Sequence, residues 1–130
     1  MSDSFEVDSF QVFGISPIVA VADVRSAVNF YVKHLGFEAL FVAEDGSYGV
    51  AGLQNQSVHF VPAADAESLA ATAKHCSFRI RVQHLDDLWK QVELTNPPTR
   101  TRPPETKPWG IREFHILDKD GALIIVSESA

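Results

Sequence analysis

The sequence is poor in cysteine, in basic residues and in long apolar runs, and each shortage argues against a class of protein. A single cysteine, Cys76, cannot form a disulfide within the chain, as expected of a protein from a reducing compartment. Lys and Arg number 11 against 17 Asp and Glu, and the charge of −6 argues against a nucleic-acid partner. No segment approaches the ~20 apolar residues of a membrane span, and acidic residues interrupt the start where a signal peptide would be apolar. We therefore expect a cytoplasmic protein with no membrane partner.

The remaining composition is that of a globular protein. Hydrophobic residues make up 45% of the 130 positions and charged residues 22%, which suits one domain or two small modules. Short β-branched segments and helical stripes follow one another so that an order of strand, helix and three strands occurs twice. The fold class predicted from this order is α+β. The predicted parts are an N-terminal arm, a first module, an Ala-rich helical connection and a second module, at residues 1–14, 15–62, 63–75 and 76–130.

Turn and capping residues mark the elements within each module. In the first module we expect a strand from Ile15 to Val21, a helix capped by Asp23 and ended by Gly36, and three strands near 37–43, 47–53 and 57–62. In the second module we expect a strand from Cys76 to Val82, followed by a helix. After the helix we expect an irregular proline-rich stretch at 96–108 with at most an edge strand, and two closing strands at 111–117 and 122–128.

Two segments carry a resemblance to a known family. VADVRSAVNFYVKHLGF at 21–37 is similar to the opening strand-to-helix signature of the vicinal oxygen chelate superfamily. PWGIREFHILDKDGALIIV at 108–126 resembles the closing hairpin of the bleomycin-resistance proteins in that superfamily. The resemblance covers 15–128 and implies two βαβββ modules whose sheets curve round a cavity, assembled as a homodimer. A short chain that lines a large pocket has little core of its own, which also favours dimerisation.

The resemblance also indicates where metal-dependent members of the superfamily hold their ion. The corresponding positions in this chain are Ser16, His59, Ser77 and Ile125. A divalent ion requires imidazole or carboxylate donors that converge on one point, and only His59 is such a donor. We therefore expect no metal site, no cofactor and no catalytic residues. That is the situation of the bleomycin-resistance proteins, which neutralise a drug by sequestering it.

Three aromatic residues are candidates for stacking on a ligand. Trp109 stands where the bleomycin-resistance family stacks a ring on the drug, and Phe41 and Tyr48 resemble its other pocket aromatics. Flat rings suit this role because offset stacking contributes about 0.5–1.5 kcal/mol beyond buried area. These three residues are alternatively core or interface aromatics. The resemblance predicts a small-molecule ligand, a planar aromatic or peptide-like antibiotic.

Strand alternation predicts which other side chains face the cavity. If Ser77 faces inward, Arg79 and Arg81 do too, while Phe78 and Ile80 pack beneath the second helix. Two inward guanidinium groups favour a carboxylate, a phosphate or an extended aromatic system. The alternative is that both arginines reach solvent or pair with acidic residues across a dimer interface.

His59 faces inward by the same alternation, either as a hydrogen-bonded pocket histidine or as a metal ligand. Two enzyme hypotheses remain beside the binding protein. One is a metal-dependent lyase or isomerase of the glyoxalase or dioxygenase kind, with a constellation of His59, Glu113 and His115. The other is a metal-free enzyme in which His59 is the base beside Arg79 and Arg81.

Overall fold

A computed structural model of the protein describes residues 9–129, and its elements follow the predicted order. The first module comprises β1 (Ile18–Val21), α1 (Val24–Leu35), β2 (Glu38–Val42), β3 (Gly49–Leu53) and β4 (Gln56–Pro62). The second comprises β5 (Ser77–Arg81), α3 (Leu85–Thr95), β6 (Thr101–Thr106), β7 (Ile111–Leu117) and β8 (Leu123–Ser129). Helix α2 (Ala66–His75) connects them. The predicted α+β class is confirmed, and no helix in residues 9–129 is long and apolar enough to cross a membrane.

The predicted capping residues begin and end helix α1. The Asp23 carboxylate accepts a hydrogen bond from the Arg25 amide at 3.1 Å, as expected of an N-cap. Gly36 ends the helix in the left-handed region, with φ of 74°, where a residue without Cβ is not strained. Helix α3 is capped differently, because the carboxylate of Glu128 on β8 accepts the amides of His84 and Leu85 at 2.9 and 3.0 Å. A side chain distant in sequence therefore anchors α3 to its own sheet.

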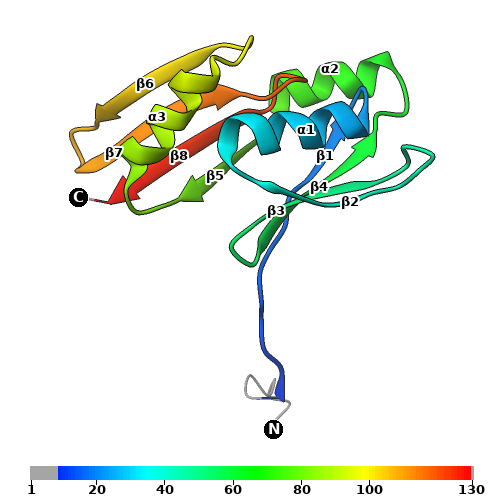
Figure 1. Ribbon diagram of the computed structural model, residues 1–130, viewed down its shortest axis with the longest axis horizontal. Coiled ribbons are helices and arrows are strands. Elements are labelled where there is room, and N and C mark those ends of the chain that lie inside the picture. Colours follow the sequence, from blue (N-terminus) through cyan, green and yellow to red (C-terminus); the bar gives the residue numbers. More distant parts are fainter. Residues whose placement is uncertain (1–8, 130) are drawn as a thin grey trace, which may run out of the picture.

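The first strand begins later than the sequence predicted. Strand β1 begins at Ile18 and not at Ile15, because Pro17 has no N–H to donate, although its carbonyl accepts the His59 amide at 2.9 Å. The described part of the predicted arm, residues 9–14, contains no strand and extends away from the body (Figure 1). The remainder of the arm, residues 1–8, lies outside the described residues.

Each module forms its own sheet in the described chain. The strand orders are β1-β4-β3-β2 and β5-β8-β7-β6, and Figure 1 shows the two sheets beside each other. In both sheets the first strand is parallel to the last strand of its module, and the other pairs are antiparallel. This repeated topology is the predicted pair of βαβββ modules.

One face of each sheet forms the core, and the other is left without a helix. Phe60 on β4 and Phe114 on β7 are fully buried, and Trp89 of α3 packs on Phe114 with ring centroids 5.1 Å apart. The opposite faces are less buried, as the alternation in β4 and β5 shows, although Glu113 and Ser127 are buried on that side of the second sheet. We call this less buried side of each sheet its open face.

Buried polar contacts connect the two modules. Tyr31 of α1 donates a hydrogen bond to Asp118, which lies between β7 and β8, at 2.8 Å. His34 of α1 and Thr95 of α3 are joined by a hydrogen bond of 2.8 Å. The Thr72 hydroxyl of α2 donates to the Ala20 carbonyl of β1 at 2.7 Å. The first two contacts join the modules, the third attaches α2 to the first sheet, and all three lie away from the open faces.

Candidate functional site

A chain of hydrogen bonds crosses the open face of the first sheet. The hydroxyl of Tyr48, just before β3, is 2.5 Å from Nδ1 of His59 on β4. Nε2 of His59 is 3.0 Å from the hydroxyl of Ser57, which is in turn 2.8 Å from the hydroxyl of Ser16. Ser57 and His59 are two residues apart on one strand, so their side chains share a face. The structure thus brings Ser16, Tyr48 and His59, three of the candidate residues, into one network.

Both ring nitrogens of His59 are engaged in this network. The ring can donate through one nitrogen and accept through the other, and hydroxyl groups can satisfy either role. A metal ion would have to displace Tyr48 or Ser57 to reach the ring. The geometry favours the predicted hydrogen-bonded pocket histidine over a metal ligand.

The candidate aromatic residues lie at accessible positions. Phe41 is opposite Val50 on β3, which is opposite His59, so these three share the open face of the first sheet. The Phe41 side chain is 53% exposed and that of Trp109 is 69% exposed. Trp109 lies in the turn that joins β6 to β7. Phe41 and Trp109 are therefore not core residues of the described chain.

A second cluster lies on the open face of the second sheet. Nη1 of Arg79 on β5 is 3.4 Å from Oε1 of Glu113 on β7, and Oε2 of Glu113 is 2.7 Å from Nε2 of His115. These hydrogen bonds, that from His115 foremost, hold the pKa of Glu113 below its ordinary value despite burial. Glu113 is therefore ionised at neutral pH and holds one side of the Arg79 guanidinium.

The alternative metal constellation is not assembled in the described chain. Glu113 and His115 are bonded to each other on the second sheet, while His59 belongs to the network on the first. Among residues 9–129 no group of three or more His, Cys, Asp or Glu side chains is placed to hold an ion. His59 also lies on a different sheet from Arg79 and Arg81, which the metal-free alternative placed beside it.

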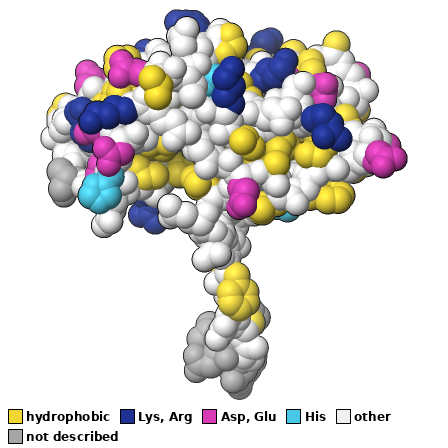
Figure 2. Space-filling view, in the orientation of Figure 1, with side chains coloured by type: hydrophobic (Ala, Val, Ile, Leu, Met, Phe, Trp, Pro, Cys, Tyr) yellow, Lys and Arg dark blue, Asp and Glu magenta, His cyan; other side chains and the backbone are white. Residues whose placement is uncertain are grey.

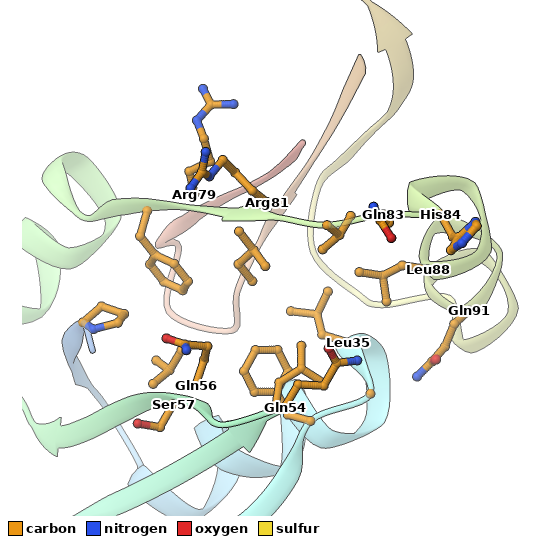
Figure 3. A pocket seen from close by; sticks show the side chains of 18 of the residues that line it. Leu35, Gln54, Gln56, Ser57, Arg79, Arg81, Gln83, His84, Leu88 and Gln91 are labelled. Carbon is orange, nitrogen blue, oxygen red and sulfur yellow. The ribbon is translucent and has the colours of Figure 1, made fainter. Parts of the chain in front are cut away.

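A cleft of about 1020 Å³ lies between the two modules on the other side of β5. Figure 3 shows Leu35 and Gln54 from the first module opposite Leu88 and Gln91 of α3. The apolar side chains of β5 line this cleft, are half-buried and pack against the hydrophobic core that includes Leu85 and Val92 of α3, on the face predicted for them. A space remains beside them because α1 packs against α3 and its end stays apart from β5. The β5 residues concerned are Phe78 and Ile80, followed by Val82.

Arg79 and Arg81 contribute to the cleft wall through β5 but do not reach into the cleft. Figure 3 shows both side chains on the opposite side of the strand from Leu35 and Gln91. The register agrees with this view. Arg79 is opposite Ile125, which is opposite His115, and Arg81 is opposite Ser127, which is opposite Glu113. Both arginines thus lie on the open face of the second sheet, as strand alternation predicted.

Sequence reasoning missed Ser57, which bridges Ser16 and His59. Its position two residues before His59 was the available signal. Reasoning from the sequence also considered Glu113 only as a metal ligand and not as the partner of Arg79. That pairing joins residues 34 positions apart and depends on the register of β5, β8 and β7.

The chain is similar to known proteins in both sequence and fold. A family model described as the Glyoxalase/Bleomycin resistance protein/Dioxygenase superfamily matches residues 12–126. A bleomycin resistance protein of Geobacillus stearothermophilus is 28% identical over 126 residues, which cover 83% of this chain and 90% of that protein. A protein of the same name from Staphylococcus aureus matches with the same identity and coverage.

Solved structures show the same arrangement of elements. The bleomycin-binding protein of Streptomyces verticillus in complex with copper(II)-bleomycin has a TM-score of 0.72 and 22% identity, covering 93% of this chain and 98% of that one. A glyoxalase-related enzyme from Clostridium phytofermentans has a TM-score of 0.70 and 19% identity, with the same two coverages. A binding protein and a protein described as an enzyme therefore share this fold.

Proposed function

We propose that this chain, which belongs to the glyoxalase/bleomycin resistance protein/dioxygenase superfamily, sequesters a planar aromatic or peptide-like antibiotic without changing it chemically. The bleomycin resistance proteins among its relatives support the antibiotic as ligand. Their alignment, which covers 83% of this chain, supports carrying the binding role over. The proposed ligand differs from bleomycin in charge, because bleomycin is cationic and Arg79 and Arg81 do not favour a cation.

The observation that carries the proposal is the chemistry of the open faces. Two rings that a flat ligand could stack on are accessible: Phe41 on the open face of the first sheet is 53% exposed, and Trp109 in the turn between β6 and β7 is 69% exposed. Tryptophan in particular is over-represented among the residues that contribute most to binding. At the positions where metal-dependent relatives place their ligands the chain has Ser16, Ser77 and Ile125. These residues are suited to lining a pocket and not to activating a substrate.

A homodimer that shares its pockets is part of the proposal. Apolar side chains gather on both sides of the place where the arm leaves the body (Figure 2). Ile18 on the open face of the first sheet is 63% exposed, Phe13 in the arm is 81% exposed, and Ile15, just after the arm, is 86% exposed. A second copy that covers these residues would remove apolar area from water at about 25 cal/mol per Å². The open face of each sheet would then become one wall of an enclosed cavity.

Replacing Trp109 by Ala tests the ligand role directly. Binding of copper(II)-bleomycin and of acridine-9-carboxylate is measured by titration calorimetry, and we expect the variant to lose about 2 kcal/mol of affinity or more for the ligand that binds. Its melting temperature without ligand should stay close to that of the parent, because the ring is 69% exposed. Leu94→Ala, which truncates another exposed apolar residue, is the matched control.

Unchanged affinity in Trp109→Ala would remove this residue from the site. Failure of the parent protein to bind either compound would overturn the proposed function itself. Chemical alteration of a bound compound, followed by mass spectrometry, would favour an enzyme over a sequestering protein.

A further inference from the structure

The arrangement of arginines on β5 points to a chemical feature of the ligand. Arg79 and Arg81 are two residues apart on one strand, so both extend from the open face of the second sheet. Arg102 of β6 lies opposite His115 on the same face. This face is rich in basic groups although the whole chain carries a formal charge of −6.

Internal pairing neutralises only part of this charge. Glu113 is 8% exposed and is shared between Arg79, at 3.4 Å, and His115, at 2.7 Å. The shorter contact is the one to His115, so Glu113 positions Arg79 without occupying all of its five N–H donors. On the other edge of the sheet, Lys107 is paired with Glu105 at 2.8 Å.

Arg81 differs from Arg79 because it has no ion pair with any residue from 9 to 129. Its side chain is exposed, and its neighbour across the ladder is Ser127, an uncharged and buried residue. Its guanidinium therefore remains available beside an Arg79 whose orientation is set by Glu113. Two guanidinium groups that extend from one strand form a site to which an anion can bind with charge-assisted hydrogen bonds.

We propose that Arg79 and Arg81 bind an acidic group of the planar ligand, a carboxylate, sulfonate or phosphate. This inference rests on the proposed function, since it concerns the same ligand and adds the open face of the second sheet to its site. It separates the ligand of this chain from cationic drugs, which the two guanidinium groups would repel. Glu113 is a positioning residue in this site, and His115 keeps it ionised.

Two acridines with opposite charge test the inference. Acridine-9-carboxylate and 9-aminoacridine share one flat ring system, and their dissociation constants are measured by fluorescence titration at low salt. We expect the parent protein to bind the carboxylate more tightly. In Arg81→Gln the affinity for the carboxylate should fall by about tenfold or more, while that for the amine should stay the same or rise.

Arg112→Gln is the matched control, because it removes the same charge from the opposite face of the same sheet. There Arg112 is bonded to Asp86 at 2.9 Å, so its loss should leave both affinities unchanged. Circular dichroism and melting curves verify that both variants fold.

Equal or tighter binding of 9-aminoacridine by the parent would overturn the acidic-group inference while leaving a planar-ligand protein in place. An equal effect of Arg81→Gln and Arg112→Gln would also overturn it, because the effect would then be one of net charge. If neither acridine nor copper(II)-bleomycin binds, the proposed function falls together with the inference.

Discussion

Replacing Tyr31 by Phe removes one hydroxyl group from the contact between the two modules and leaves the packing of the ring unchanged. The Tyr31 side chain is fully buried and stacks edge-on against Phe37 and Phe60, at centroid distances of 5.4 and 5.0 Å. Burial, followed by the charge of Asp118, raises the pKa of Tyr31, so the hydroxyl stays protonated and donates at neutral pH. The perturbation is therefore the loss of one buried hydrogen bond.

The expected loss of stability follows from the hydrogen bonds that the Asp118 carboxylate accepts. Asp118 is 2% exposed, and its Oδ1 accepts the amides of Asp120 and Ala122, both at 2.9 Å. Its Oδ2 accepts the Tyr31 hydroxyl, which phenylalanine cannot replace. A hydrogen bond to a charged group contributes about 1.5–3 kcal/mol, so we expect the free energy of unfolding to fall by about that amount.

Urea unfolding at pH 7, followed by circular dichroism, measures the loss. Tyr48→Phe is the control, since it removes a hydroxyl that is only half-buried on the open face and should cost less than about 1 kcal/mol. Desolvation raises the pKa of Asp118, and the Tyr31 hydrogen bond lowers it, so Tyr31→Phe should raise that pKa further. The difference in the free energy of unfolding between Tyr31→Phe and the parent should then become smaller as the pH falls and Asp118 becomes protonated. A loss no larger than that of Tyr48→Phe would refute this account of the module contact.

Two further outcomes are expected. Burial, followed by repulsion from Lys33, lowers the pKa of His34 below 6.5. The unfolded chain therefore binds the proton first, and the free energy of unfolding should decrease as the pH drops through about 6.5. In urea titrations, the free energy of unfolding of His34→Gln should decrease less between pH 7.5 and pH 5.5 than that of the parent. An equal decrease in both proteins would contradict this reasoning. Sedimentation velocity at micromolar concentration should give a particle of two chains, whereas a single-chain particle would contradict the shared pockets.

The sequence by itself determined the elements and the facing of their side chains, because both depend on neighbours in the chain. Asp23 and Gly36 act as caps where the helical pattern begins and ends, and both make their capping contacts with residues of the helix itself. The alternation in β5 correctly placed Arg79 and Arg81 on one face, because successive residues of any strand point to opposite sides. Of the strand boundaries discussed above, only the start of β1 was wrong. Strand β1 begins after Pro17, which has no N–H to donate to a neighbouring strand.

Tertiary structure alone decided which side chains meet. Tyr31 and Asp118 are 87 residues apart, and their contact exists because α1 of one module packs on the β7–β8 turn of the other. The partner of Arg79 is Glu113 because of the register of three strands, which no local pattern specifies. The network that includes His59 likewise required Tyr48, just before β3, and Ser16, before β1, to come beside β4. The periodicity of a strand or helix determines the face toward which a side chain points, but the packing of distant segments determines which residues that side chain contacts.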